Sequence, residues 1–381
     1  MDLAALPAVL DGHNDTLLRL HLSRRGHGRS FFERGDTGHI DVPRAREGRF
    51  GGGFFAVFVP PQSSSADDLT ITDTGYEVRL ASPIDVAYAQ RATMAMTARL
   101  FRLETQADGQ VAVARTVADL RRCLRDGVLA MILHFEGAEV IDPDLDALEI
   151  FYRAGLRSLG IVWSRPNLYG HGVPFRYPGS PDTGPGLTEA GRRLVHACNR
   201  LGIMLDLSHL NERGFWDVAG LSDAPLVATH SAAHAICPVT RNLTDTQLDA
   251  IKESDGLVGM NFEVSVVRPD GVDNPETPLG VFVRQVDYLV ERLGIDRVAF
   301  GSDFDGATMP HVIGDVAGVP KLLEALRAHG YDEVALRKVA HENWLRVLGK
   351  TWHDETGGGT DSFMVGYGGV MCPPCYVYDE F

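Results

Sequence analysis

The feature of this sequence that most restricts its fold is a short, nearly continuously apolar run that recurs eight times. Each run ends in a polar or small residue and is followed by a helix-like stretch. The runs are PAVLDGHND (7–15), GGFFAVFVP (52–60), GVLAMILHFEG (127–137), LRSLGIVWS (156–164), GIMLDLSH (202–209), PLVATHS (225–231), GLVGMNFE (256–263) and RVAFGSDFDG (297–306). Such runs are typical of strands buried on both faces. Eight of them alternating with helices predict an α/β protein with a (β/α)8 TIM barrel.

Two of the intervening stretches show helical periodicity clearly. Residues 277–294 place Leu279, Phe282, Val283, Val286, Leu289, Val290 and Leu293 on one stripe, and Gly294 is a typical helix end. Residues 187–202 repeat this design. A doubly wound sheet is the rival fold, but it usually carries a Gly-rich phosphate loop after its first strand, where this chain has DGHND.

Two long connections and a tail interrupt the regular alternation. The connections 61–126 and 164–186 are the kind of long loop that often has a function, so we expect long βα loops over the barrel. We predict one hydrolase domain over residues 1–353 and a C-terminal extension over residues 354–381. The extension contains CPPC, Cys372 to Cys375, but a zinc site needs four ligands and no second pair exists.

Charge and cysteine content exclude several classes of protein. A formal net charge of -15 argues against nucleic acid or an anionic membrane as partner. The N-terminus has no basic segment followed by an apolar one, and no run reaches the roughly 18 apolar residues of a membrane span. We therefore expect a cytoplasmic protein without a membrane anchor. Its five cysteines form no disulfide framework.

The ends of the predicted strands carry the residues that suggest chemistry. In a barrel of this type the active site lies at the C-terminal ends of the strands. Those ends carry His13, Asp15, Glu136, His209, His230 and Asp303. Burying unpaired ionisable groups costs on the order of several kcal/mol each. A bound cation would offset that cost for all of these groups at once. Three histidines with carboxylates suit zinc, and five ligands suit two metals that share one carboxylate at about 3.5–4 Å separation.

Other histidines have weaker claims to a function. A lone buried histidine is more often a hydrogen-bonded core residue than a ligand. His134 precedes Glu136 by two residues and could line the same pocket, and His234 follows His230 by four and could border it. We interpret the remaining histidines, which fall in loops or on helix faces, as structural.

The spaced motifs DGHND, HFEGAE, DLSHL, THSAAHAICPVTRNLTD and GSDFDG resemble those of the membrane (renal) dipeptidases, metallopeptidase family M19, within the amidohydrolase-like barrels. The resemblance covers about residues 8–350. It implies that His13 and Asp15 bind one metal, that His209 and His230 bind a second, and that Glu136 bridges them. It also implies that Arg241 holds the substrate carboxylate, that Asp303 handles the proton of the bridging water, and that the protein is a homodimer.

The activity implied by the resemblance is hydrolysis of the peptide bond of dipeptides by a metal-bridging hydroxide, with two zinc ions as cofactors. Asp303 would take the proton from the water and pass it to the leaving amine. A clamp by Arg241 would restrict substrates to very short peptides. The resemblance further implies that a D-residue at the second position is accepted besides an L-residue.

Lysine content bears on the bridging ligand. Many related barrel hydrolases bridge their metals through a carboxylated lysine at the end of strand four. The four lysines here, Lys252, Lys321, Lys338 and Lys350, all lie away from the predicted strand ends. Any bridge must therefore come from Glu136, which points away from phosphotriesterase-like and dihydroorotase-like relatives.

One position departs from the family pattern. Strand four of the well-known dipeptidases ends in Thr-His, and that histidine contacts the scissile carbonyl, whereas this chain has Trp163. Tryptophan donates one hydrogen bond and cannot carry a positive charge. Arg165 or His171, both in the loop that follows, could assist the developing oxyanion in its place, or the metals could suffice.

Two alternative functions stay open on the sequence. One is a related binuclear amidohydrolase that acts on N-acyl amino acids, lactams or dehydropeptides. The other is a catalytically silent barrel that acts as a binding or scaffold protein. The complete set of ligand-type residues argues against the silent barrel.

Overall fold

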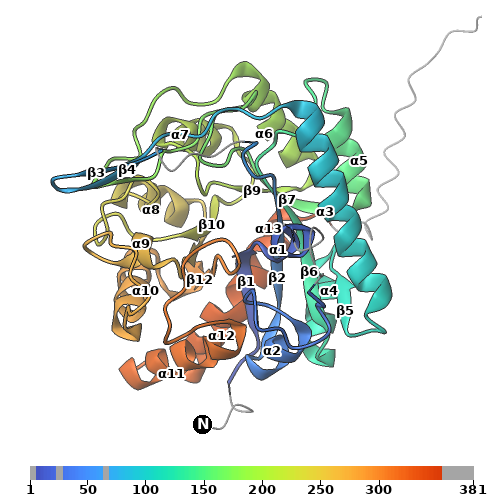
Figure 1. The fold of residues 1–381 in the computed structure, drawn as a ribbon, viewed down its shortest axis with the longest axis vertical. Helices are drawn as coiled ribbons and strands as arrows, with labels where there is room; N and C mark the ends of the chain where they lie inside the picture. The colour runs from blue at the N-terminus through green and yellow to red at the C-terminus, as the bar shows by residue number, and fades with distance from the viewer. Residues whose placement is uncertain (1–5, 23–28, 63–67, 354–381) are drawn as a thin grey trace, which may run out of the picture.

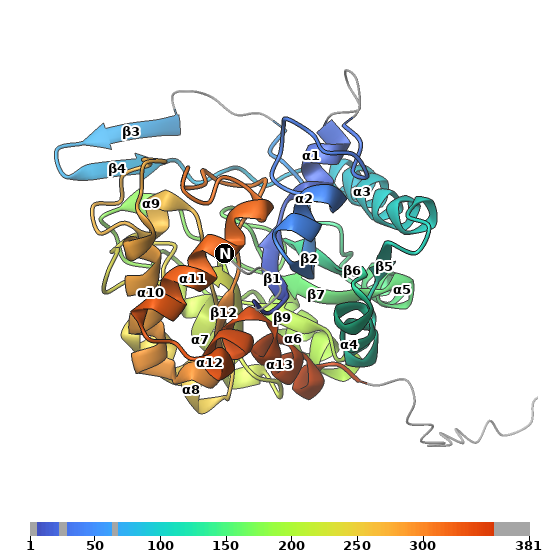
Figure 2. The ribbon, with the colours of Figure 1, turned by 90° about the horizontal axis from the view of Figure 1, so that it is seen from below.

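The computed structural model describes residues 6–22, 29–62 and 68–353, and all eight apolar runs form strands of one parallel sheet (Figures 1 and 2). These strands are β1 (Val9–Asn14), β2 (Phe50–Phe58), β6 (Leu129–Glu136), β7 (Leu156–Gly160), β9 (Met204–Asp206), β10 (Val227–Ser231), β11 (Leu257–Met260) and β12 (Val298–Phe300). They pair in chain order. A parallel bridge between Asn14 and Phe304 closes the ring, and the amide of Asp15 donates to the carbonyl of Phe304 (2.8 Å). The predicted TIM barrel is confirmed.

Helices surround the strands (Figure 1). They are α1 (Thr16–Leu22), α2 (Val42–Glu47), α3 (Val86–Gln106), α4 (Val117–Asp126), α5 (Asp146–Ala154), α6 (Glu189–Leu201), α7 (Glu212–Leu221), α8 (Asp245–Glu253), α9 (Val264–Val267), α10 (Leu279–Leu293), α11 (Val319–His329), α12 (Glu333–Arg337) and α13 (Asn343–Thr351), with the short 3-10 helices η4 (Ile295–Arg297) and η5 (Val316–Gly318) and the short π-helix η6 (Lys338–Glu342). The two helices predicted from periodicity are α6 and α10. Each ends at a glycine with positive φ, Gly202 (70°) and Gly294 (85°), a conformation that glycine adopts without strain.

The part of the barrel interior away from the C-terminal ends of the strands is filled by apolar side chains. Leu10, Phe54, Ile132, Met204 and Leu257 pack there against the indole of Trp344, at the N-terminal end of α13. The Trp344 Nε1 donates to the carbonyl of Phe300 (3.1 Å). A side chain at Gly12 would lie 2.6 Å from that indole, so β1 needs glycine there. This apolar floor leaves only the C-terminal ends of the strands for polar side chains.

The long connections contribute a second, small sheet that the sequence pattern does not predict. It consists of β3 (Leu69–Thr72), β4 (Gly75–Val78) and β8 (Arg176–Tyr177), and it joins the two long loops because β4 pairs with β8. Strand β3 is exposed throughout, so no buried face marks it in the sequence. The β3–β4 hairpin projects beyond the barrel in Figure 2. A further short strand, β5 (Val111–Val113), pairs with the start of β6.

Part of the sequence prediction falls outside the described residues. These parts are residues 63–67 of the connection 61–126 and the tail 354–381 with its CPPC motif, so the division into a 1–353 domain and a tail stays a prediction. Among the described helices, none combines the length and apolar character needed to cross a membrane.

Candidate active site

The six strand-end residues predicted to carry chemistry lie together at the C-terminal end of the barrel. Glu136 is at their centre: its Oε1 is 2.9 Å from His209 Nε2 and 3.6 Å from His230 Nε2. Its Oε2 instead lies 3.7 Å from His13 Nε2, which in turn is 3.5 Å from Asp15 Oδ2. The two oxygens of one carboxylate therefore face two different groups of residues.

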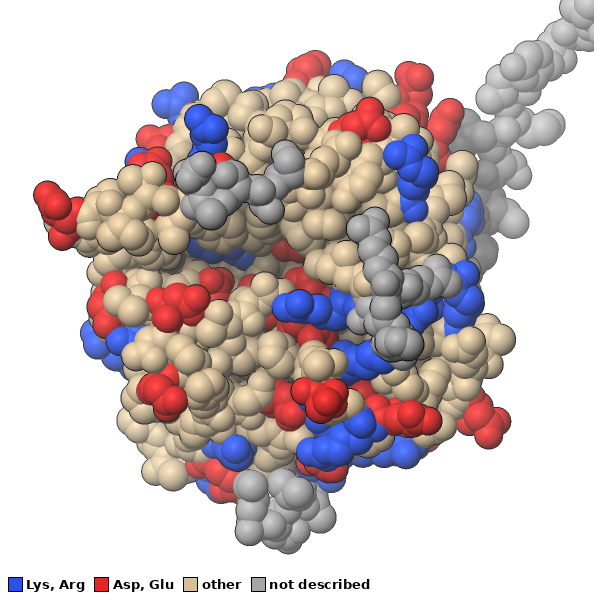
Figure 3. All heavy atoms as spheres, viewed as in Figure 1, with Lys and Arg blue, Asp and Glu red and all other residues tan. Residues whose placement is uncertain are grey.

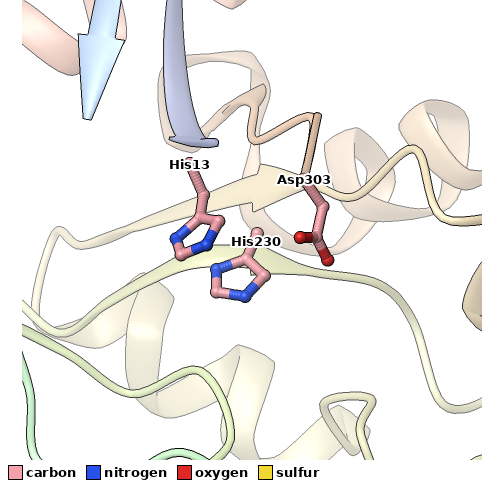
Figure 4. A group of neighbouring side chains, drawn as sticks. All are labelled: His13, His230 and Asp303. Atoms are coloured by element: carbon pink, nitrogen blue, oxygen red, sulfur yellow. The ribbon is translucent and has the colours of Figure 1, made fainter. Parts of the chain in front are cut away.

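These distances define two overlapping sets of ligand atoms. His13, Asp15 and Glu136 form one set, and Glu136, His209 and His230 form the other. Within each set the candidate atoms all lie within 4.8 Å of one another. Figure 4 shows His13, at the end of β1, with its ring beside that of His230 and with Asp303 directed toward both. The arrangement fits two ions that share the Glu136 carboxylate.

Hydroxyl groups orient two of the imidazoles. The Oγ of Ser164 is 2.9 Å from His209 Nδ1, and the Oγ1 of Thr229 is 2.8 Å from His230 Nδ1. Both contacts leave the Nε2 atoms facing Glu136. Partners on the far ring nitrogen fix the tautomer and the ring angle of metal-binding histidines in the same way.

The positive charges that the protein places near the site do not fully neutralise its buried carboxylates. Burial alone would lower the pKa of His13, but the carboxylates of Glu136, Asp15 and Asp303 raise it to about 10. Burial raises the pKa of Glu136 well above its usual range, with Asp15 and Asp303 adding to the effect. Burial also lowers the pKa of His209 and His230, so both rings are neutral. Neutral imidazoles beside under-compensated carboxylates are the ligand set of a divalent cation.

Unsatisfied polar atoms point to the same conclusion. Among the described residues, both ring nitrogens of His13 and the Oδ1 of Asp15 are buried without a hydrogen-bond partner. Buried polar groups are normally hydrogen-bonded, and exceptions need an explanation. A metal ion would satisfy His13 Nε2 and Asp15 at once, so the residues present fit a metal.

We therefore expect a chelator to destabilise the protein. Removing ions held at 1,000 times their dissociation constant withdraws about 4 kcal/mol from the folded state. For a chain of this size the melting temperature should fall by roughly 5 °C or more. Differential scanning fluorimetry with and without chelator measures the shift, and Glu136→Ala is the control because it should already lack the shift. An unchanged melting temperature of the unmodified protein would contradict the metal site.

Asp303 is held in an unusual backbone conformation beside the two sets. Its φ is +62°, and His209 has a φ of +66°. Residues other than glycine that are held at positive φ often mark functional sites, because the surrounding structure must offset the strain. The Nδ2 of Asn261 donates to Asp303 Oδ2 (3.1 Å). Burial raises the pKa of Asp303, His13 opposes the effect and Asp15 adds to it, so this carboxylate is poised to accept a proton.

A cleft of about 520 Å³ opens above these residues. Its lining residues are Asp15, Leu18, Arg19, Phe58, Glu136, Trp163, Phe175, His209, Arg241, Glu263, Asp303, Asp305, Gly306, Ala307 and Thr308. Figure 3 shows a hollow in the middle of this face with acidic side chains around it. The volume suits a small molecule and would not admit a folded protein segment.

Besides Arg19, the cleft is lined by a second arginine, Arg241. It follows β10 in the loop of the TRNLTD motif, is 5% exposed, and its Nη2 donates to the carbonyl of His230 (2.9 Å). Burial lowers its pKa, but Asp303, Asp206 and Glu136 act in the opposite direction. A guanidinium in this position stays charged and can bind a carboxylate with two hydrogen bonds.

Trp163 occupies the strand-four position of the cleft wall, where the family pattern has histidine. Its ring lies 4.9 Å from Phe58, 5.8 Å from Phe175 and 5.9 Å from His209, measured between centroids. Together Phe58, Trp163 and Phe175 form what we call the aromatic wall. Apolar side chains therefore contact the cleft here, in place of a charged one.

The two residues proposed as substitutes for the strand-four histidine are not among the described residues that line the cleft. Arg165 is fully buried, its Nε donates to Glu139 (2.6 Å), and its guanidinium is 5.5 Å from the Trp163 ring. The Nδ1 of His171 is 3.4 Å from the carbonyl of Gly186. This geometry therefore argues against a direct contact of Arg165 or His171 with substrate.

Other sequence predictions need adjustment. His134 does not line the cleft but lies beneath it, with Nδ1 2.9 Å from Ser158 Oγ. His234 bonds to the carbonyl of Gly179 and is not a lining residue either. Asp305, the second acid of the GSDFDG motif, lines the cleft, is buried and accepts from Thr16 Oγ1 (3.0 Å).

Sequence reasoning missed Glu263, which lines the cleft directly after β11. The signal was available, because Glu263 is the last residue of the seventh apolar run and a carboxylate there is as exceptional as Glu136 in the third. The aromatic residues Phe58 and Phe175 were missed because aromatic side chains near strands usually indicate core.

A parallel barrel whose strand ends gather buried imidazoles and carboxylates defines the class of amidohydrolase-like metallohydrolases. Comparisons with known proteins narrow this class. Residues 2–356 match the family model of the membrane dipeptidases, peptidase family M19. The chain belongs to this family of metallo-dipeptidases.

Individual relatives agree with the family model. The chain is 49% identical over 270 residues to a protein of Klebsiella pneumoniae from the pqqA 5′ region, covering 71% of this chain and 97% of that protein. It is 30% identical over 350 residues to dipeptidase tcpJ of Claviceps purpurea, covering 89% and 76%. A metallopeptidase crystal structure from Rhodobacter sphaeroides, liganded with a phosphinate mimic of L-Ala-D-Ala, shares 54% identity with a TM-score of 0.86, covering 91% of this chain and all of that one.

Proposed function

We propose that this protein is a dipeptidase that uses two zinc ions to hydrolyse the peptide bond of dipeptides, including those with a D-residue in the second position. The observation that carries the proposal is the position of Glu136, whose two oxygens face His209 on one side and His13 on the other. The likeness to a metallopeptidase bound to a mimic of L-Ala-D-Ala supports the choice of substrate. A homodimer remains part of the proposal.

In the proposed site, His13, Asp15 and Glu136 would hold one ion, and Glu136, His209 and His230 the other. When bound, such ions polarise a carbonyl and lower the pKa of water to near 7. The protein's own groups do the rest. Arg241 binds the C-terminal carboxylate and fixes the second residue, while Asp303 accepts a proton from the attacking water and returns it to the leaving amine. Asn261 holds Asp303 in place through its amide (3.1 Å).

Replacing Arg241 tests the carboxylate clamp. Arg241→Ala should raise KM for a dipeptide by roughly 100-fold, since a bidentate charged contact is lost. Arg241→Lys keeps the charge but loses the two-pronged guanidinium geometry. Its KM should lie between those of the unmodified protein and Arg241→Ala. A C-amidated dipeptide provides the matching change in the substrate. The unmodified protein should hydrolyse it poorly, and Arg241→Ala should discriminate little between amide and acid. An unchanged KM in Arg241→Ala would remove the assignment.

A substrate screen separates this proposal from its alternative, an amidohydrolase acting on N-acyl amino acids or lactams. Dipeptides and N-acyl amino acids both offer a carboxylate to Arg241, but only dipeptides carry a free α-amino group. We expect L,L- and L,D-dipeptides to be hydrolysed at least tenfold faster, in kcat/KM, than the matching N-acetyl amino acids. Faster hydrolysis of the N-acyl compounds would favour the alternative.

A further inference from the structure

Two acids that line the cleft have no part in the proposed mechanism: Asp305, which accepts from Thr16 Oγ1 (3.0 Å), and the half-buried Glu263. Glu263 follows β11, and its side chain has no described Lys or Arg partner within ion-pair distance in the part of the chain that the structure covers. Ser265 Oγ donates to its Oε1 (2.6 Å). Burial, reinforced by the charge of Asp303, raises the pKa of Glu263 to about 7. Its charged form is therefore incompletely compensated by the protein alone.

The order of the strands places Glu263 relative to the substrate. Arg241 follows β10, Glu263 follows β11 and Asp303 follows β12, and these three strands are neighbours in the ring. Arg241, Glu263 and Asp303 all line the same cleft, and the charges of Arg241 and Asp303 both affect the pKa of Glu263. Arg241 would bind the carboxylate of the second residue and Asp303 would protonate its amine. Glu263 thus lies beside the second residue.

The wall on this side of the cleft differs in chemistry from the aromatic wall. Thr308, which also lines the cleft, accepts at its carbonyl from the amide of Val264 (3.2 Å), so it adjoins Glu263. The hydroxyl of Thr308 donates to Asp273 (3.3 Å), and Asp273 also raises the pKa of Glu263. The aromatic wall comes instead from the last residue of β2 and from the segment after β7, across the ring. Polar and acidic groups therefore face one end of the substrate and aromatic rings the other.

We propose that Glu263 is a specificity-determining residue that binds a positively charged side chain on the second residue of the dipeptide. The inference rests on the proposed dipeptidase function, because the position of the second residue follows from the roles of Arg241 and Asp303. A cationic side chain of lysine length would supply the compensating positive charge that Glu263 lacks. The α-amino group of the first residue is the competing cation, but it lies on the other side of the scissile bond from Arg241.

The test compares Ala-Lys with Ala-norleucine, which has the same chain without the ammonium group, with the second residue supplied in L and in D form. The unmodified protein should prefer Ala-Lys by about tenfold or more in kcat/KM, since a half-buried charge-assisted contact is at stake. In Glu263→Gln this ratio should fall to near one, and Glu263→Asp should keep part of it. The ratio is measured within one preparation, so the fraction of active protein cancels.

A charge control and the contrary outcomes complete the test. Asp273→Asn removes an exposed neighbouring acid but keeps Glu263, so the Lys-to-norleucine ratio should stay within about twofold. Equal rates for both dipeptides in the unmodified protein would overturn the inference and leave the dipeptidase function intact. An equal loss on both dipeptides in Glu263→Gln would assign Glu263 to the α-amino group and overturn it too. Hydrolysis of neither dipeptide would overturn both proposals.

Discussion

Glu136→Ala should abolish metal binding and activity together. Both proposed ion sites depend on this carboxylate, whose two oxygens lie 2.9 Å from His209 Nε2 and 3.7 Å from His13 Nε2. Without it one set of ligand atoms retains His13 and Asp15, and the other retains His209 and His230. Two ligands rarely hold a catalytic zinc, which usually has three protein ligands. The ions supply several kcal/mol of transition-state stabilisation, so kcat/KM should fall by about 1,000-fold or more.

Metal content is the decisive measurement for this variant, made by elemental analysis of purified protein. Glu136→Gln is the isosteric companion, which keeps the volume but loses the charge and should also bind less than the full complement of metal. Glu263→Gln removes a second carboxylate of the same cleft and should leave metal content unchanged. Full metal stoichiometry in Glu136→Ala would disprove the bridging role.

Asp303→Asn should retain metal but lose most of its activity. General acid–base groups typically contribute about 100- to 10,000-fold, and we expect kcat to fall within that range. Asparagine is the suitable replacement, because Asp303 has a φ of +62° and asparagine tolerates this conformation better than most residues. The amide can still hydrogen-bond but cannot accept the proton. KM should change much less than kcat, since in the proposed site Arg241 and the ions would provide the binding.

Two controls separate a catalytic loss from a structural one. The melting temperature of Asp303→Asn should stay within a few degrees of the unmodified protein, and its metal content should be the same. Asn261→Ala removes the group that donates to Asp303 (3.1 Å) and should lower kcat less, by roughly tenfold. Normal kcat in Asp303→Asn would mean that another group carries the proton.

The barrel was predictable because it depends on the order and burial of apolar runs, which are local in sequence. Each of the eight runs forms a strand, and helices α6 and α10 end at the glycines that the sequence pattern predicts as helix ends. The hairpin β3–β4 was not predictable in the same way. Its first strand, with Leu69 and Ile71, is exposed, so no buried face marks it in the sequence, and the hairpin is held to the other long loop by the pairing of β4 with β8.

The candidate site was predictable to a similar extent and for a similar reason. His13, Glu136 and Asp303 stand out because ionisable side chains are exceptional at the ends of buried strands. The positions of Arg165 and His171 were not predictable, because they depend on how loop 164–186 folds. Only the structure shows that Arg165 pairs with Glu139. Glu263 was visible in the sequence but had no motif to draw attention to it.

The most direct test of the two-metal dipeptidase is a zinc titration of metal-free protein, followed by hydrolysis of a dipeptide such as L-Ala-D-Ala. The account predicts that the metal-free protein is inactive and that activity rises with added zinc to a plateau at two equivalents per chain. Activity that is already full without metal, or a plateau at one equivalent, would contradict it.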